Sequence, residues 1–270
     1  MDEQIRSIGV VGLGKMGAPI SRHLLRSGFQ VHGFDIDEGA NGTARAAGVQ
    51  VSESPAELAS KCDLIIILTA YERQAMEVVL GTEGVAAGAR TGTIIGIGAT
   101  IAPQAMRLIA DQLQGRGLVA LDMPICRGER AADAGKLLIT GGGDRKAFEQ
   151  CRPAFAAFAD AVHYLGPAGS GQVGKMVNNL ILWACISANH EGMNLGEKLG
   201  VDREAMRAML LDSSAANWAL ETRVAELAMP WAEKDMMIVL DEADQARMSL
   251  PLAGVIKEVI KGIKIERGDF

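Results

Sequence analysis

A lysine and an asparagine four residues apart are the side chains in this sequence best suited to acid–base chemistry on a small molecule. A glycine-rich approach from Gly169 leads through Gly171 to Lys175 and Asn179. In a helix, positions i and i+4 project from the same face, about one turn apart. An amine can accept or donate a proton, whereas an amide can orient an oxygen or a hydroxyl group without titrating. The pair indicates a proton-transfer site, although most helical lysines are solvated surface residues.

A second chemical signal is a glycine-rich loop near the N-terminus, with the sequence Gly12-Leu13-Gly14-Lys15-Met16-Gly17. In dinucleotide-binding domains the first glycine of this pattern allows a tight turn, the second admits a pyrophosphate, and the third lets helix and strand pack closely. The free N–H groups at the start of the following helix favour phosphate. The alternative is an ordinary glycine-rich turn between a strand and a helix.

Asp35 favours the dinucleotide interpretation and also selects the cofactor. It ends the second predicted strand 18 residues after Gly17, close to the interval of about 20 expected for the acidic residue of such a site. A carboxylate there accepts hydrogen bonds from the ribose hydroxyls of NAD and repels the 2′-phosphate of NADP. Asp37 and Glu38 add negative charge, and no arginine follows Asp35 immediately. We therefore predict NAD as the cofactor.

The elements that position these residues follow from the pattern of apolar residues. Short apolar runs predict strands at residues 8–11, 31–34, 64–68, 93–95, 118–121 and 137–139, alternating with helical patterns. This alternation predicts a Rossmann-type α/β fold with a doubly wound parallel sheet. From about residue 170 to 199 the apolar spacing is helical, and further helices are expected from Asp202, near Trp231 and from Pro251. The predicted domains are an NAD-binding domain, 1–165, and an all-helical domain, 166–270, which a long interdomain helix opens.

Composition excludes several classes of protein. The chain has 270 residues, 49% of them hydrophobic, which is typical of a globular protein and excludes disorder. A net charge of −6 without a run of Lys or Arg gives nucleic acid and anionic membranes nothing to bind. Apolar runs fall far short of the roughly 20 residues needed to span a bilayer, and the acidic N-terminus is unlike a signal peptide. Four cysteines without metal-ligand spacing predict no metal site, no disulfides and a cytoplasmic location. The long apolar helix predicts a homo-oligomer and does not fix the number of subunits.

Taken together, these motifs resemble the β-hydroxyacid dehydrogenase family, which includes 3-hydroxyisobutyrate dehydrogenase and tartronate semialdehyde reductase. The glycine loop, the segment from Gly171 to Asn179, and Lys234-Asp235-Met236 match family motifs in the same order along nearly the whole chain. The resemblance implies hydride transfer between nicotinamide and a small anionic 3-hydroxy acid or its semialdehyde. It implies that Lys175 is catalytic, with Asn179 helping to hold substrate. It also implies that Lys234, Thr69 and Thr100 contact the cofactor, and that Asn178 belongs to the substrate site.

The chain departs from the family at the substrate-binding segment. Where members carry a serine and two glycines, this sequence has Cys126, Arg127 and Gly128, and we expect these three residues to bind substrate. A guanidinium group suits a carboxylate, sulfonate or phosphate. Sulfolactaldehyde reductases of this family resemble the chain in having an arginine here, so a sulfonate reductase is one alternative, although Leu182 is less suited to a sulfonate than a small polar residue. Another alternative is that Arg127 binds no substrate and is a surface residue or the salt-bridge partner of Glu129.

Two further questions remain open from the sequence. A non-catalytic NAD-binding protein is an alternative function, although Lys175 and Asn179 argue against it. The region between Ser214 and Lys234 is shorter than in typical members. Trp218 and Trp231 lie in this region and can shape the substrate pocket, but large aromatic residues are more often part of a core.

Overall fold

A computed structural model describes residues 5–222 and 231–268 of the chain. The chain divides into two compact units, Met1–Lys175 and Met176–Phe270. Helix α9 (Ser170–Lys198) begins in the first unit and continues in the second, so Lys175 is the last residue of the α/β unit. The shortened region predicted from sequence includes residues 223–230, which lie outside the described residues.

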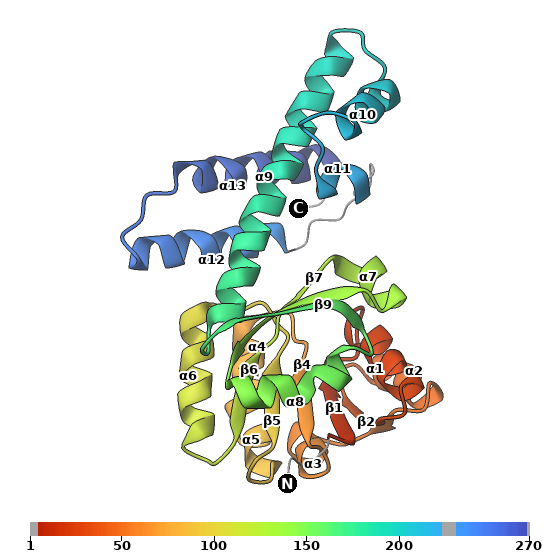
Figure 1. Cartoon of the computed structure of the whole chain (residues 1–270), viewed down its shortest axis with the longest axis vertical. Coiled ribbons are helices and arrows are strands. Elements are labelled where there is room, and N and C mark those ends of the chain that lie inside the picture. The colour runs from red at the N-terminus through yellow and green to blue at the C-terminus, as the bar shows by residue number, and fades with distance from the viewer. Residues whose placement is uncertain (1–4, 223–230, 269–270) are drawn as a thin grey trace. The chain divides into compact units, whose positions relative to one another are not determined.

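The first unit is built on a nine-stranded, mostly parallel sheet (Figure 1). Its strands are β1 (Ser7–Val11), β2 (Gln30–Phe34), β3 (Gln50–Val51), β4 (Leu64–Ile67), β5 (Ile94–Ile97), β6 (Val119–Asp122), β7 (Ile125–Cys126), β8 (Leu137–Gly143) and β9 (Ala159–Gly166). The order β3-β2-β1-β4-β5-β6 is parallel throughout. Strand β8 runs antiparallel to β6 and β7 and parallel to β9. This order is that of the Rossmann fold and confirms the predicted fold class.

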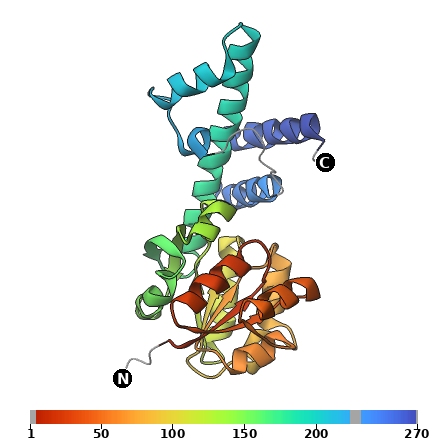
Figure 2. The same ribbon diagram turned by 90° about the vertical axis from the view of Figure 1, so that its right-hand side faces the viewer.

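Helices lie on both sides of this sheet (Figure 2). They are α1 (Gly17–Arg26), α2 (Glu38–Ala46), α3 (Pro55–Ser60), α4 (Glu72–Leu80), α5 (Val85–Gly88), α6 (Pro103–Gln114), α7 (Gly128–Ala134) and α8 (Arg145–Phe155). Residues of α1, α2, α7 and α8 form one buried apolar cluster with the sheet. Residues of α3 to α6 form the other. Because both faces of the sheet are covered, its central strands are expected to be mostly apolar on both faces.

Strand β4 shows how the sequence encodes this burial. Leu64 and Ile66 belong to one cluster, and Ile65 and Ile67 belong to the other, with all four side chains fully buried. Alternate residues of a strand point to opposite faces of the sheet. The uninterrupted apolar run is therefore the sequence of a strand buried on both faces.

The helical unit consists of the remainder of α9 together with α10 (Arg203–Leu211), α11 (Trp218–Thr222), α12 (Ala232–Gln245) and α13 (Pro251–Arg267). Helices α9, α12 and α13 enclose an apolar core that includes Trp183, Met236 and Ile260. Asp202 caps α10 by accepting the N–H of Ala205 at 2.9 Å. The helices expected from Asp202, near Trp231 and from Pro251 are thereby confirmed.

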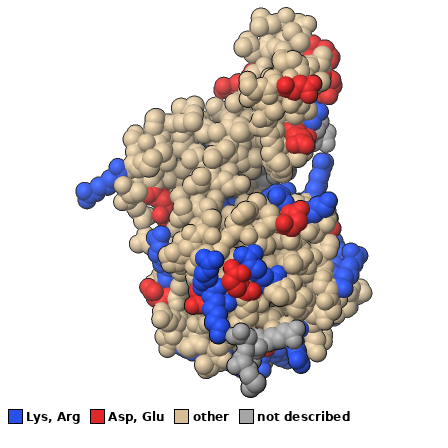
Figure 3. Space-filling view, in the orientation of Figure 1, with Lys and Arg blue, Asp and Glu red and all other residues tan. Residues whose placement is uncertain are grey.

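The structure corrects one alternative for this part of the sequence, that Trp218 and Trp231 belong to a core. Trp218 and Trp231 are 40% and 42% exposed, so neither is a core residue. Among the described residues, no helix is both long enough and apolar enough to cross a membrane. On the face drawn in Figure 3, acidic and basic side chains of the α/β unit are interspersed.

Strands β3, β7 and β9 were not predicted from the sequence. The first two have two residues each, too few to show a periodicity. Strand β9 is longer, but only Ala159 is fully buried. It lies outside the main strand path and pairs with β8, so its sequence lacks the apolar run of a central strand.

Candidate active site

The glycine loop lies at the carboxyl end of β1, where parallel sheets of this type bind ligands. Gly12 has φ of +95°, and a Cβ there would lie 2.6 Å from the carbonyl oxygen of Leu68. A Cβ on Gly17 would lie 1.7 Å from the carbonyl oxygen of Gly12. Both positions therefore require glycine for the fold itself.

Gly14 is different, because a Cβ built there meets no atom within 4 Å. Its backbone faces open space at the start of α1, whose N–H groups can bind an anion. The loop thus has the two properties that a pyrophosphate needs: an unobstructed approach to the backbone and a helix N-terminus next to it. These residues fit a dinucleotide.

Asp35 directly follows β2 and is held beside this loop. Its Oδ2 accepts the N–H of Leu13 at 2.6 Å, and its Oδ1 accepts the N–H of Asp37 at 2.9 Å. The amide of buried Asn41 pairs with the backbone N–H and carbonyl of Asp35, at 3.0 and 2.9 Å. The carboxylate is therefore fixed next to the loop, as required of a group that binds the adenosine ribose.

Other predicted cofactor residues lie along the same edge of the sheet. Thr69 and Thr100 follow β4 and β5 and are half-buried. Lys15 and Met16 lie between the glycines, and the Lys15 amine forms an ion pair with Glu129 at 3.2 Å. The alternative that Arg127 is the salt-bridge partner of Glu129 is therefore wrong, because Glu129 pairs with Lys15.

The substrate-binding segment departs from ordinary backbone geometry. Arg127 has φ of +83° and Gly128 has φ of +74°, so an arginine occupies a left-handed conformation that favours glycine. Its Nη1 donates to the carbonyl oxygen of Lys136 at 3.0 Å and pairs with the Asp160 carboxylate. Cys126, in β7, is buried. The guanidinium thus has an acidic partner on β9 that the sequence did not predict.

The second turn of α9 carries the predicted base. Lys175 lies five residues after the start of the helix at Ser170 and is half-buried. Asn179 is buried, and its Oδ1 accepts the amide N–H of exposed Asn178 at 3.0 Å. The single helix brings Lys175 and Asn179 to the same face, as their spacing predicts.

Lys234 lies in the first turn of α12, and its amine is 5.7 Å from the centre of the Trp231 ring, a cation–π distance. The neighbouring Asp235 is buried, and its Oδ2 accepts the indole N–H of Trp183 at 3.3 Å. Met236 is part of the helical core. Within this motif, Asp235 and Met236 thus hold the helices together and leave Lys234 at the start of α12.

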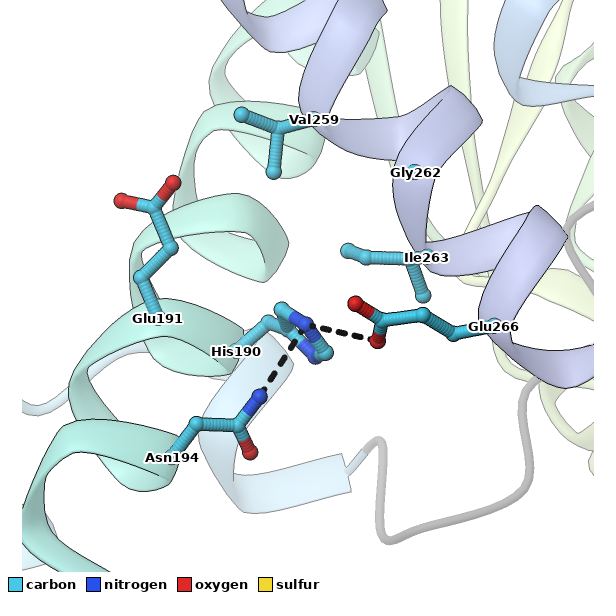
Figure 4. A pocket seen from close by; sticks show the side chains of 7 residues that line it. All are labelled: His190, Glu191, Asn194, Val259, Gly262, Ile263 and Glu266. Atoms are coloured by element: carbon cyan, nitrogen blue, oxygen red, sulfur yellow. Dashed lines mark hydrogen bonds and ion pairs between the residues drawn. The ribbon is translucent and has the colours of Figure 1, made fainter. Parts of the chain in front are cut away.

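The helical unit contains a pocket of its own, of about 370 Å³, between α9 and α13 (Figure 4). The ring Nε2 of His190 lies 3.1 Å from Asn194 Nδ2 and 3.5 Å from Glu266 Oε2. Val259 and Ile263 supply its apolar wall. None of the residues predicted for the site lines this pocket.

The cysteines are free, and burial raises the pKa of Cys62 and of Cys151 to about 12. Such thiols stay protonated at neutral pH and are poor nucleophiles. Across residues 5–222 and 231–268, no group of three or more His, Cys, Asp or Glu side chains is arranged to hold a metal ion.

Sequence reasoning missed several residues of the site. Asp122, Gln172, Asn41 and Asp160 make the supporting contacts, yet only Gln172 lies inside a motif segment named from the sequence, that from Gly171 to Asn179. Each of the other three is a common polar residue, and its position in the sequence does not indicate which residue it bonds to. For Gln172, the one signal in the sequence was its place between two motif residues, Gly171 and Lys175.

Comparison with known proteins agrees with this geometry. The family described as "NAD binding domain of 6-phosphogluconate dehydrogenase" matches residues 7–166. The family described as "NAD-binding of NADP-dependent 3-hydroxyisobutyrate dehydrogenase" matches residues 169–269. Together these matches cover nearly the whole chain.

Individual relatives agree. The chain is 34% identical to an L-threonate dehydrogenase of Cupriavidus necator, over 94% of this chain and 89% of the relative. It is also 34% identical to an NAD-dependent L-serine dehydrogenase of Pseudomonas aeruginosa, over 80% and 73%. A Mycobacterium tuberculosis 3-hydroxyisobutyrate dehydrogenase, solved with L-serine, is 26% identical with a TM-score of 0.85, over 97% and 94%.

Fold, site and relatives define an oxidoreductase that uses a nicotinamide dinucleotide. The chain belongs to the β-hydroxyacid dehydrogenase family. Hydride transfer on small 3-hydroxy acids is the chemistry of its named relatives.

Proposed function

We propose that this chain transfers hydride between NAD and a small anionic 3-hydroxy acid or the matching semialdehyde. Lys175 is the proton-transfer residue, and Asn179 and Asn178 orient the substrate. Arg127, Gly128 and Cys126 hold the substrate's anionic end. The domain that binds dinucleotide is 1–165, and the helical domain is 166–270.

The observation that carries this proposal is that the α/β unit presents a cofactor edge and a lysine together. Gly14, Asp35, Thr69 and Thr100 follow the carboxyl ends of successive parallel strands. Lys175 belongs to the same compact unit, in a helix whose first turn is hydrogen-bonded to the ends of β5 and β6. The lysine and the cofactor edge are therefore parts of the same compact unit.

The residues divide the reaction as follows. The nicotinamide, when bound, accepts or donates the hydride. In the oxidising direction the neutral amine of Lys175 takes the proton from the substrate hydroxyl; in the reducing direction the ammonium polarises the carbonyl and returns that proton. The amide of Asn179 holds the substrate oxygen and does not compete for the proton. Half-burial of Lys175 limits access of water to the transferred proton.

Asp35 supports NAD over NADP, since its fixed carboxylate would face a 2′-phosphate. Lys234 and Lys15 are the basic residues proposed to reach the dinucleotide. A cytoplasmic location is supported by four free cysteines, and a homodimer or homotetramer by exposed apolar side chains on the helical unit, such as Ile181, Leu195 and Leu252.

A sulfonate is the second candidate for the anionic group, and Arg127 is the observation that favours it. A guanidinium group can make a strong, bidentate contact with such an anion, and Arg127 here pairs with the Asp160 carboxylate. The half-buried Leu182 is two turns beyond Lys175 and offers a sulfonate no hydrogen bond. We therefore place carboxylate substrates first.

The test combines a substrate panel with one variant. Hydroxy acids, hydroxy sulfonates and their aldehydes are screened by the absorbance of reduced nicotinamide. With the best substrate, Lys175→Ala should lower kcat by ~10²–10⁴-fold, and the Kd of NAD should stay within about threefold. Lys198→Ala, an exposed lysine of the same helix, is the matched control and should retain full activity. A Lys175→Ala enzyme with most of its turnover would exclude Lys175 from the mechanism.

A further inference from the structure

The first turn of α9 is tied to the sheet by a fully buried carboxylate. Asp122, the last residue of β6, accepts the N–H of Gly169 at 3.2 Å through Oδ1 and the N–H of Gln172 at 3.0 Å through Oδ2. The first N–H groups of a helix lack intrahelical partners and carry partial positive charge. Helix caps usually come from the residue just before the helix, whereas this one comes from a strand about 50 residues earlier.

Gln172 extends this connection to the next strand. It is buried, its Nε2 donates to the carbonyl oxygen of Ala99 at 2.9 Å, and its Oε1 accepts the N–H of Ile101 at 3.2 Å. These two backbone groups flank Thr100. One amide therefore holds both sides of a residue proposed to contact the cofactor.

The helix also approaches the sheet as closely as the backbone allows. Thr140 Oγ1 donates to the carbonyl oxygen of Gly171 at 2.9 Å. A Cβ on Gly171 would lie 2.5 Å from the carbonyl oxygen of Thr140 and 2.7 Å from Asp122 Oδ2. The turn cannot shift toward the sheet, and the hydrogen bonds prevent it from moving away.

We propose that Asp122 and Gln172 are positioning residues that fix Lys175 relative to the Thr100 loop, so that the base and the cofactor edge are held in one geometry. Lys175 follows Gln172 by three residues, which places it one helical turn beyond the anchored turn. Side chains in a helix lean toward its N-terminus, and thus toward this anchor. A displacement of about 1 Å at a reacting group can cost on the order of 10²-fold in rate.

This inference rests on the proposed function, since it assigns Asp122 and Gln172 a role through Lys175 and Thr100. It adds two residues that touch neither substrate nor cofactor. Their effect should therefore appear in kcat and leave the affinity for NAD nearly unchanged, because the glycine loop and Asp35 are held by other hydrogen bonds.

The primary variant is Asp122→Asn, which keeps the shape of the side chain but replaces one acceptor oxygen with a donor. Asp63→Asn is the matched control, because Asp63 Oδ2 also accepts two backbone N–H groups, from Arg6 and Ser7, both at 3.0 Å. Asp63 precedes β4 and so lies at the opposite edge of the sheet. Both variants should unfold at a lower temperature. Only Asp122→Asn should lower kcat, by about 10²-fold, with the Kd of NAD changed less than threefold.

Gln172→Met provides a second route, in case Asp122→Asn fails to fold. It retains the length and burial of the side chain and removes both bonds to the Thr100 loop, so kcat should again fall by at least about tenfold. Combining Asp122→Asn with Lys175→Ala should lower the residual rate no further than Lys175→Ala alone, as expected for residues that act as a unit.

The outcomes separate the two proposals. Loss of kcat in Lys175→Ala with normal kcat in Asp122→Asn and Gln172→Met would overturn the positioning role and leave the proposed function intact. An equal loss of kcat in Asp63→Asn and Asp122→Asn would also overturn it, because general destabilisation would then explain both. An active Lys175→Ala enzyme would instead overturn the proposed function.

Discussion

Replacing Arg127 with glycine separates the contribution of this residue to stability from its contribution to substrate recognition. Arg127 has φ of +83°, which costs a non-glycine residue roughly 1–2 kcal/mol. The replacement relieves this strain. It also removes the ion pair with Asp160, which is partly exposed and worth about 0–1 kcal/mol, and the hydrogen bond to Lys136, worth about 0.5–1.5 kcal/mol. Gains and losses are of similar size, so the free energy of unfolding should change by less than about 1 kcal/mol.

Arg127→Ala provides the contrast, because alanine keeps the strained backbone and loses the same two contacts. It should be less stable than Arg127→Gly by roughly 1 kcal/mol, measured by urea unfolding. Arg247 supplies a matched control, since it also has a positive φ, of +55°, and is exposed in the helical unit. Arg247→Gly should relieve similar strain and leave activity unchanged.

Activity should respond differently from stability. If the guanidinium binds the anionic group of the substrate, both Arg127→Gly and Arg127→Ala should lose ~1.5–3 kcal/mol, or roughly ten- to two-hundred-fold in kcat/KM. The Kd of NAD should not change. Arg127→Lys should restore part of the loss, since an ammonium group cannot make a bidentate contact. Normal kcat/KM for every anionic substrate in the Gly variant would show that Arg127 serves only to bind Asp160 and Lys136.

Three further predictions concern the nucleotide edge and pH. The enzyme should prefer NAD over NADP by at least about tenfold in kcat/KM, or roughly 1.4 kcal/mol; Asp35→Asn should shrink this ratio, and equal use of both cofactors by the unaltered enzyme would contradict the role of Asp35. Gly14→Ala should fold normally but bind NAD at least tenfold more weakly by fluorescence titration, whereas Gly17→Ala should be strongly destabilised, because its Cβ would overlap a carbonyl oxygen; normal NAD affinity in Gly14→Ala would refute the pyrophosphate site. Burial raises the pKa of the Asp122 carboxyl above its ordinary value, so folding favours the protonated form of this group. The stability that this protonation contributes is fully present below the unfolded-state pKa and is lost as pH rises through the folded-state pKa. The melting temperature of the unaltered protein minus that of Asp122→Asn should therefore decrease as pH rises from about 4 toward neutrality, and a difference that increases over this range would contradict it.

The parts of the structure that the sequence predicted are those with local signals. The central strands were visible because burial on both faces produces continuous apolar runs, as in Leu64–Ile67. Long helix α9 was visible because its apolar spacing extends over many turns, and the glycine loop because tight turns and close packing restrict residue type. Strands β5 and β6 begin one residue later than expected, because the boundary between a turn and a strand is not sharp in sequence.

What the sequence could not predict depends on contacts between distant residues. Asp160 pairs with Arg127 across 33 positions, and Gln172 bonds to Ala99 across 73. Nothing in the spacing of these residues indicates a partner. Edge strand β9 was missed for a related reason, since it is only partly buried and its pattern depends on what it pairs with.

The anchoring of α9 also bears on the order in which the enzyme becomes competent during folding. Each β–α–β step of the nucleotide edge closes a short segment of chain, as Leu13 and Asp35 do across 22 residues. The bonds of Asp122 and Gln172 that fix the lysine-bearing helix join residues 47 to 73 positions apart, and such distant contacts are entropically costly to form and tend to form slowly. A newly made chain is therefore expected to acquire its capacity to bind NAD before its capacity to turn over substrate. A partly folded molecule would then hold cofactor without consuming it.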